Sequence, residues 1–200
     1  MQIQEAIKHL RENSKKRGFP QTVDLIINLK NINLKDPSNK INKEFVLPHG
    51  RGKDVSVCVI GEKEEINKDM LGELAKDKKR AKKIIDSYDF FLCEAPLMPI
   101  VGKTIGRFLG PRGKMPKPIP PNADKTKFVE LAKKSVRIRV KDSPVIHTVV
   151  GTENMKDDEL KDNIEFLVRK IQETLPKGRA QIKDILLKLT MSKPVKIEVK

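Results

Sequence analysis

Residues 106–122, with the sequence GRFLGPRGKMPKPIPPN, limit the possible folds of this chain more than any other segment. The segment contains three glycines, five prolines and four basic residues. Each proline fixes its own φ angle and lacks a backbone donor, whereas glycine readily adopts positive φ. Both properties disfavour helices and strands. We therefore predict a loop that follows a fixed course.

This loop has two interpretations. Its composition is common in rigid connectors that are exposed to solvent. Alternatively, its backbone N–H groups and its four cations face phosphate groups. It is not a phosphate-binding loop of the nucleoside-triphosphatase type, because Phe108 occupies a position that requires glycine and Met115 stands where Ser or Thr should follow the lysine. The four cations are Arg107, Arg112, Lys114 and Lys117.

The formal net charge of +15 at pH 7 indicates an anionic partner. The charge is not confined to a tail, because residues 1–53, 54–134 and 135–200 carry +6, +5 and +4. A nucleic acid is the favoured partner. A membrane surface is the weaker alternative, because the chain has no basic amphipathic helix with a Trp or Phe face. The sequence also has no apolar run of about 18 residues and no signal peptide, so we expect a soluble cytoplasmic protein.

Patterns that would indicate catalysis or metal binding are missing from the sequence. Cys58 and Cys93 lie singly in apolar runs, and we interpret both as small buried side chains. The histidines belong to no Ser-His-Asp order and no HExxH motif. We expect no enzyme activity, no cofactor and no metal. The alternative is an enzyme whose middle layer binds a nucleotide, but the turn after residues 55–60 contains only Gly61 and lacks GxGxxG.

The pattern of apolar residues changes along the chain and predicts two domains. Residues 54–134 contain nearly continuous apolar strands that alternate with helices, as expected for an inserted α/β domain with a Rossmann-like, three-layer arrangement. The outer segments contain half-exposed strands and two amphipathic helices. We expect residues 1–53 and 135–200 to form one discontinuous α+β domain with an antiparallel sheet. Residues 48–53, PHGRGK, mark the crossing between the two domains.

Apolar periodicity also predicts the individual elements. In the outer domain, helices are expected at residues 2–16 and from residue 157 onward, and strands at 23–30, 41–47, 136–140, 145–150, 182–191 and 195–199. In the inserted domain, strands are expected at 54–61 and 89–93, surface helices within 63–83, a helix at 96–109 closed by Gly110, and a short helix around residues 128–132.

A polar strip is expected on the outer domain if strand 23–30 pairs with strand 182–191. Alternate side chains of each strand would face away from the apolar side of the sheet. Each of them alone is most simply interpreted as a solvated strand side chain. On the first strand these side chains are Asp24, Asn28 and Lys30, and on the second they are Asp184, Lys188 and Thr190.

The end of this strip indicates RNA binding. Phe19 and Met191 would lie there beside Ser192 and Lys193, so that apolar side chains are surrounded by hydroxyl groups and cations. Such a surface suits folded RNA, because Thr or Asp can hydrogen-bond a ribose 2′-OH while apolar atoms exclude water. Asp24 would repel bare phosphate, so we expect it to accept from 2′-OH or base donors.

The crossing at PHGRGK has two interpretations. Paired glycines between domains favour a hinge. The alternative is a secondary contact with RNA phosphates. The side chains available for that contact are His49, Arg51 and Lys53, together with Arg112 and Lys114 of the predicted loop.

Several motifs carry a resemblance to a known family. The most specific is LGPRGKMPKP at residues 109–118. It is accompanied by LPHGRGK at 47–53, DFFL at 89–92, PLMP at 96–99 and LTMSKP at 189–194. Together they resemble the L1 family of large-subunit ribosomal proteins in its archaeal form, and the resemblance extends over nearly the whole chain.

The resemblance implies a structural protein of the large ribosomal subunit that is a monomer when free. The implied partners are large-subunit rRNA at the mobile side stalk, the exit-site tRNA whose release it assists, and its own mRNA, whose translation it represses. In the family, glycine usually stands at the position of Ser192, and the position of Asn28 is often basic, so these two contacts differ here. The strip and the resemblance together predict RNA contacts by Phe19, Thr22, Asp24, Asn28, Lys30, Lys188, Thr190, Met191, Ser192 and Lys193.

Overall fold

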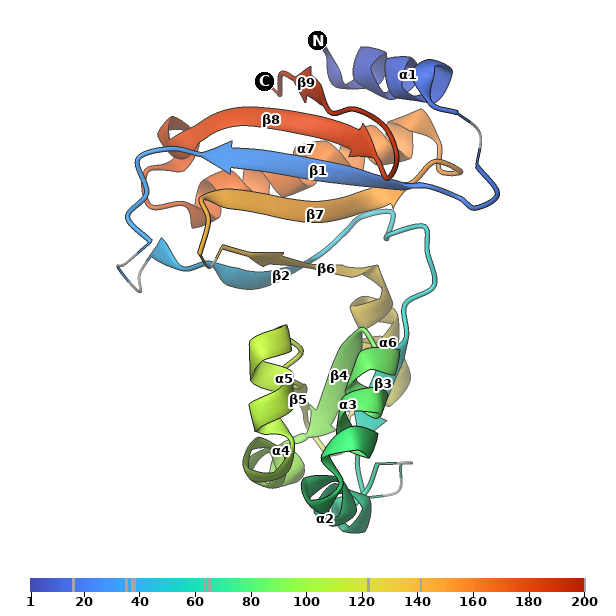
Figure 1. Cartoon of the computed structure of the whole chain (residues 1–200), viewed down its shortest axis with the longest axis vertical. Helices are drawn as coiled ribbons and strands as arrows, with labels where there is room; N and C mark the ends of the chain where they lie inside the picture. The colour runs from blue at the N-terminus through green and yellow to red at the C-terminus, as the bar shows by residue number, and fades with distance from the viewer. Residues whose placement is uncertain are drawn as a thin grey trace. The chain divides into compact units, whose positions relative to one another are not determined.

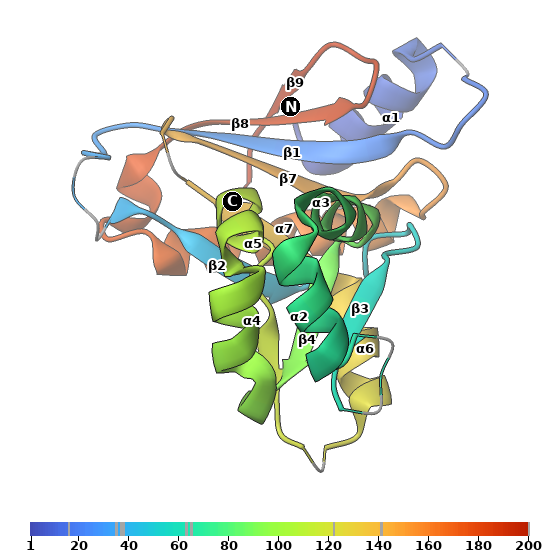
Figure 2. The same cartoon turned by 60° about the horizontal axis from the view of Figure 1, so that its bottom comes forward.

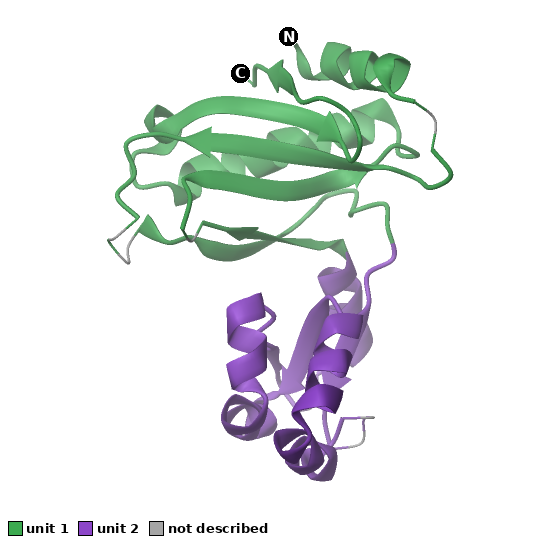
Figure 3. Ribbon diagram, in the orientation of Figure 1, with its two compact units in different colours: residues 1–53, 134–200 green, residues 54–133 purple. Residues whose placement is uncertain are grey.

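The computed structural model describes residues 1–15, 17–34, 36, 39–62, 64, 66–121, 123–140 and 142–199. The chain forms two compact units, coloured separately in Figure 3. Unit 1 consists of residues 1–53 and 134–200, and unit 2 consists of residues 54–133.

Unit 1 contains a four-stranded antiparallel sheet in the order β7-β1-β8-β9 and a two-stranded antiparallel pair, β2-β6. Its helices are α1 (Ile3–Asn13) and α7 (Asp157–Thr174), followed by a 3-10 turn, η3 (Gly178–Gln181). Its strands are β1 (Thr22–Leu29), β2 (Asn42–Val46), β6 (Ser135–Arg139), β7 (Val145–Thr152), β8 (Ile182–Leu189) and β9 (Val195–Ile197).

One face of the larger sheet is covered by the helices of unit 1. Figure 1 shows α7 behind β7, β1 and β8. Leu25 and Ile27 of β1 are fully buried in one core with Leu187 of β8 and with Ile164 and Leu167 of α7. Because strand side chains alternate between faces, the residues between these apolar positions lie on the other, half-exposed face. This alternation places the polar strip opposite the core.

Unit 2 contains a parallel sheet in the order β3-β4-β5. Helices α2 to α5 share one core with the sheet, and α6 shares another core with it. The sheet is therefore the middle of three layers, with helices on both faces. Figure 2 shows α2 and α4 in front of β4. Its strands are β3 (Val57–Ile60), β4 (Phe90–Glu94) and β5 (Lys117–Ile119). Its helices are α2 (Lys68–Lys76), α3 (Lys78–Ser87), η2 (Ala95–Leu97), α4 (Met98–Thr104), α5 (Gly106–Arg112) and α6 (Lys125–Lys134).

Strand β4 is buried on both faces. Phe91 and Cys93 belong to the core with α2 to α5, whereas Phe90 and Leu92 belong to the core with α6. This explains the continuous apolar run in the sequence. Cys93 and Cys58 are both buried free thiols, as predicted. Burial raises the pKa of the Cys93 thiol to about 11, so this thiol stays protonated at neutral pH. The predicted fold class, a split α+β domain with an inserted α/β domain, is confirmed.

The prediction of a continuous loop at residues 106–122 is wrong, because this segment begins with helix α5 and includes strand β5. Pro111 is tolerated because it lies in the last turn of a seven-residue helix, where its missing donor removes at most one helical bond. Gly113 then ends the helix at φ 68°, with Gly113 N–H donating to Gly110 O and Lys114 N–H donating to Leu109 O.

Strand β5 accommodates a second proline from the same segment. Pro118 pairs with Cys93 of β4, and β5 lies at the edge of the three-stranded sheet. An edge strand can include proline because its outer side needs no donor for the sheet. Pro111 and Pro118 are therefore compatible with α5 and β5, because each lies at a position where the missing N–H costs little free energy.

Two predicted helix boundaries also need correction. The helix expected at residues 96–109 is divided, because α4 ends at Thr104 and α5 begins at Gly106 and continues through Gly110. The first helix ends at Asn13 instead of residue 16, because Ser14 is extended with φ −93° and ψ 134°. Lys15 and Arg17 therefore lie beyond α1, and Lys16 lies outside the described residues.

Candidate nucleic-acid interface

Strands β1 and β8 pair as the polar strip requires. They are antiparallel neighbours, with Asp24 opposite Lys188 and Asn28 opposite Asp184. Side chains directly opposite each other on one face of a sheet are close enough to interact. The strip therefore alternates acidic and basic or amide groups across two adjacent strands, and its net charge is low despite the high charge of the chain.

Thr22 and Thr190 close one end of the strip. Their hydroxyl oxygens lie 2.8 Å apart, and Thr22 N–H donates to Thr190 Oγ1 at 3.0 Å. Thr190 N–H returns a bond to the Thr22 carbonyl at 3.1 Å. The Thr22 hydroxyl also hydrogen-bonds the Asp24 side chain. Either hydroxyl can be the donor in the bond between the two threonines, and in both cases a hydroxyl lone pair and the lone pairs of the Asp24 carboxylate remain available as acceptors.

The Asp24 carboxylate is partly withdrawn from water. Burial raises its pKa, while Lys188, His147 and the Thr22 hydroxyl act in the opposite direction. A carboxylate in this setting gains from donors that replace the lost water. Ribose 2′-OH and base amino groups are such donors, whereas phosphate offers none.

The other end of the strip is neutralised within the protein. Lys196 of β9 forms an ion pair with Asp184 and holds the pKa of this carboxyl below its usual value. Asn28 and Lys30 lie near this end, and Lys30 N–H donates to the carbonyl of Gln181. Asp184 therefore has a charged partner within the protein, whereas Asp24 forms no ion pair with another described residue.

Two large apolar side chains are exposed beyond the threonine pair. Phe19 is 48% exposed and Met191 is 60% exposed. Gln21 ties their segments together, because its side-chain oxygen accepts Met191 N–H at 3.1 Å while its amide nitrogen donates to Glu153 at 3.3 Å. The N-terminal and C-terminal segments thus form one surface within unit 1.

Ser192 stabilises the turn after β8. Its hydroxyl accepts Leu189 N–H at 2.8 Å and lies 3.1 Å from the carbonyl of Lys193. These local bonds account for a serine at a position where the resemblance implies glycine. Lys193 follows on the exposed side of the same turn.

The PHGRGK segment is tied to the interior of unit 1. Asn163 of α7 is fully buried, and its amide donates to Gly50 O at 3.0 Å and to Val150 O at 2.9 Å. Its oxygen accepts His49 N–H at 3.2 Å, and the His49 ring lies 3.0 Å from Asp162. Gly50 and Gly52 both adopt positive φ. Lys53 is exposed and Arg51 is partly buried in the same segment.

The cations around α5 are engaged by unit 2 itself. Lys114 Nζ donates to the carbonyls of Ile85 and Tyr88 at 2.9 and 2.7 Å, at the C-terminal end of α3. Arg112 pairs with Asp86 at 2.8 Å. Arg107 lies 4.8 Å from the centre of the Phe108 ring. Arg112 and Lys114 therefore have structural partners in unit 2, and the phosphate contact remains a prediction for both.

The chain that carries this arrangement on unit 1 also matches known proteins in its sequence. The sequence profile described as the Ribosomal protein L1p/L10e family matches residues 10–193. The chain belongs to this family. The resemblance in the motifs is thereby confirmed, and a family of ribosomal proteins is not a class of enzymes.

Archaeal relatives of this L1-family chain match over almost their full length. A protein of Methanothermococcus thermolithotrophicus is 45% identical over 98% of this chain and 97% of its own. One from Methanopyrus kandleri is 46% identical over 94% of this chain and 92% of its own. One from Pyrococcus horikoshii is 44% identical over 98% of this chain and 95% of its own. Each is named large ribosomal subunit protein uL1.

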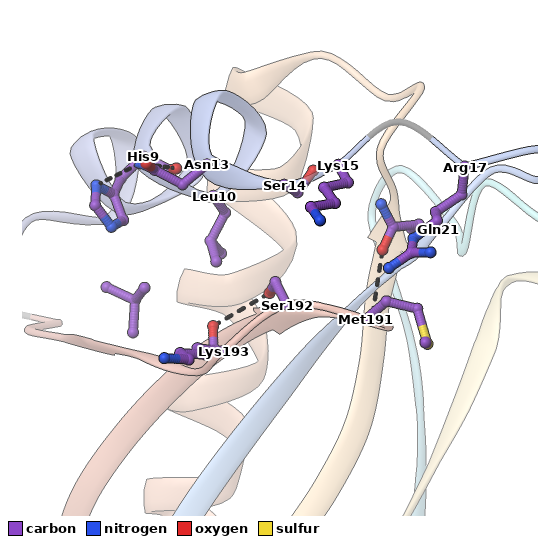
Figure 4. Close-up of a pocket in the computed structure, with 11 residues that line it drawn as sticks. His9, Leu10, Asn13, Ser14, Lys15, Arg17, Gln21, Met191, Ser192 and Lys193 are labelled. Carbon is purple, nitrogen blue, oxygen red and sulfur yellow. Dashed lines mark hydrogen bonds between the residues drawn. The ribbon is translucent and has the colours of Figure 1, made fainter.

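Sequence reasoning missed a pocket on unit 1 of this L1-family protein. The pocket has a volume of about 430 Å³ and lies between the end of α1 and the turn that follows β8 (Figure 4). It joins residues that are more than 170 positions apart in sequence, so periodicity gave no sign of it. The basic cluster at residues 15–17 was the available signal, but the helix predicted at residues 2–16 extended into it.

Two further findings concern the described parts of the chain. No group of three or more His, Cys, Asp or Glu side chains among them is placed to hold a metal ion. None of their helices is long and apolar enough to cross a membrane.

Proposed function

We propose that this protein is a structural component of the large ribosomal subunit, in the cytoplasm, and that it binds rRNA directly through unit 1. The carrying observation is the end of the polar strip. There the Asp24 carboxylate adjoins the Thr22–Thr190 pair, and Gln21 joins the segments that carry exposed Phe19 and Met191. Acceptors for 2′-OH next to apolar atoms are features that recognise folded RNA.

The relatives' name supports a place in the large subunit, and the motif resemblance supports a finer assignment. We assign the contact to the mobile side stalk of the rRNA, with a role in release of deacylated tRNA from the exit site. We also propose that the same surface binds the protein's own mRNA and represses its translation. Repression then begins only after the rRNA sites are filled, which requires rRNA to bind more tightly than mRNA.

A basic helix on unit 2 supports a second contact with nucleic acid. Helix α3 and its preceding residue have the sequence DKKRAKKIIDS, and its five cations are exposed. Asp77 is occupied in capping the helix, and Glu73 pairs with Arg80. The remaining lysines form a positive face that suits a phosphate backbone without reading sequence. We assign this face to the tRNA.

The deciding experiment measures binding of the full chain to a transcribed rRNA fragment that contains the mobile side stalk. Affinity should fall steeply as salt rises from 50 to 300 mM, because several phosphates release counterions. A scrambled RNA of equal length is the control and should bind much more weakly. A flat salt response, or equal affinity for the scrambled RNA, would contradict the proposal.

The competing hypothesis is a nucleotide-binding enzyme, and thermal unfolding distinguishes the two. A ligand that binds the folded state raises the melting temperature. We expect the rRNA fragment to raise it and ATP or NAD to leave it unchanged. The opposite result would favour the enzyme.

A further inference from the structure

The pocket between α1 and the turn after β8 adjoins the proposed RNA-binding surface. Gln21 and Met191 belong to its lining, and they directly precede and follow the Thr22–Thr190 pair. Figure 4 shows Ser14 and Lys15 above the pocket and Met191, Ser192 and Lys193 below it. An RNA bound along the polar strip would therefore reach the mouth of this pocket.

The charge of the lining is entirely positive. Lys15, Arg17 and Lys193 contribute cations, and none of the described residues that line the pocket is acidic. None of these three cations forms an ion pair with another described residue. Figure 4 shows Lys15 just after α1, Arg17 beside Gln21 and Lys193 on the turn opposite α1, so positive charge stands on different sides of the pocket.

The other side chains that line the pocket are apolar or uncharged polar groups. Leu10 is buried and Val195 is half-buried, which gives an apolar wall, and Met191 is exposed at the rim. The Asn13 amide nitrogen donates to the His9 carbonyl at 2.9 Å, so its oxygen remains as an acceptor. Flat apolar groups with polar edges are therefore favoured over a simple ion.

These features together fit one kind of occupant. A nucleotide inside an RNA chain has a flat base with polar edges and a phosphate on each side. A volume of about 430 Å³ is in the range of small-ligand sites. Free phosphate would use the cations but leave the apolar wall unfilled.

We propose that this pocket receives a single unpaired nucleotide of the RNA that unit 1 binds. The base packs against Leu10, Val195 and Met191, and its two flanking phosphates face Lys15 with Arg17 on one side and Lys193 on the other. Because recognition of an unpaired base requires it to leave its stack, the pocket selects RNA with a bulge or loop at one fixed distance from the strip. This inference rests on the proposed function.

The first test fills the pocket without altering charge. Ser14 is half-exposed and extended, so a larger side chain is compatible with its backbone. We expect Ser14→Phe to weaken binding of the rRNA fragment about tenfold, which is in the range for loss of one stacked base. Ser14→Ala is the matched control and should bind like the wild type. Equal thermal stability of both variants shows that folding is unaffected.

The second test identifies the nucleotide. A series of rRNA fragments carries one abasic site each, at successive unpaired positions. For the wild type, one position should lose about tenfold in affinity, whereas Ser14→Phe should show no loss at that same position. The two losses should not add, because the abasic site and Ser14→Phe each remove the same contact between the base and the pocket. Additive losses at every position would overturn the proposal.

The third test separates a nucleotide from a phosphate. Lys15→Ala should reduce the salt dependence of binding, and Lys8→Ala should not, because Lys8 is exposed on α1 but does not line the pocket. If Lys15→Ala acts while Ser14→Phe binds normally, the pocket holds a phosphate only and the proposal is wrong. If the wild type does not bind the rRNA fragment at all, the proposed function itself fails.

Discussion

The hydroxyl oxygen of Thr190, the residue that follows strand β8, lies 2.8 Å from that of Thr22, the first residue of strand β1. Thr22 N–H also donates to the Thr190 hydroxyl oxygen, and Thr190 N–H donates to the Thr22 carbonyl. The pair is therefore ordered before any ligand arrives. A preordered group loses little conformational freedom on binding, so its hydrogen bonds contribute more to affinity.

Thr190→Val should weaken binding to the rRNA fragment by about tenfold. The substitution keeps the branched shape but removes the hydroxyl that orders Thr22, and a neutral hydrogen bond is worth roughly 0.5–1.5 kcal/mol, which is up to about tenfold in affinity. Met191→Asp should weaken binding further, because it adds a negative charge to an apolar contact. Fluorescence anisotropy measures both. Lys114→Ala in unit 2 is the comparison and should leave affinity nearly unchanged. The reverse ranking would move the site to unit 2.

Asp24 and Asp184 should change stability with pH in opposite senses. Burial raises the pKa of Asp24, so the folded protein binds more protons than the unfolded chain between pH 3.8 and that raised value. Stability therefore falls as pH rises through this window. Asp24→Asn should remove this pH dependence and should raise the free energy of unfolding at pH values above the window.

For Asp184 the sign is reversed. Its hydrogen bond to Lys196 lowers its pKa below 3.8, so its contribution is present above pH 3.8 and lost as pH falls through the lowered value. Asp184→Asn should therefore reduce stability at pH 7 and have little effect at the acidic end. Urea denaturation from pH 2.5 to 7 measures both variants. Shifts of the same sign for the two variants would contradict the assignment.

Asn163→Ala should destabilise unit 1 by about 2–4 kcal/mol, because it removes three hydrogen bonds from a fully buried site and leaves two carbonyls unsatisfied. Asp162→Ala is the neighbouring control. Its contact with His49 is exposed, so the loss should stay below about 1 kcal/mol. Urea unfolding followed by circular dichroism gives both values, and equal losses would show that Asn163 is not the anchor of this segment.

Two glycines of unit 2 should respond in opposite directions to alanine. Gly113→Ala should lower stability by about 1 kcal/mol, because Gly113 adopts φ 68° at the end of α5. Gly102→Ala should raise stability by up to about 1 kcal/mol, because Gly102 is helical in α4 and a Cβ there meets open space. Thermal melts of the two variants provide the measurement. A gain in stability for Gly113→Ala would argue against the helix end described above.

The polar strip was predictable because alternation in a strand depends on its own residues. Val23, Leu25 and Ile27 indicate the buried face, and Asp24 and Asn28 follow on the other. The pairing register was not predictable in the same way. That Lys188 stands opposite Asp24 depends on bonds between distant segments.

The error at residues 106–122 has a physical origin. Composition treats every proline alike, whereas the cost of proline depends on position in an element. Pro111 lies in a last turn and Pro118 on a sheet edge, and neither fact is visible before the fold is known. The pocket was missed for a related reason, because Leu10 and Val195 meet only in the folded unit.

Strand β1 lies between β7 and β8, which are supplied by residues 145–152 and 182–189. During synthesis the chain emerges from its N-terminus, and domains generally fold as units once they are complete. Unit 2 is complete in sequence at residue 133, whereas β1 must wait for both partners. A translating ribosome must therefore release every residue up to the end of β8 before unit 1 can complete its larger sheet.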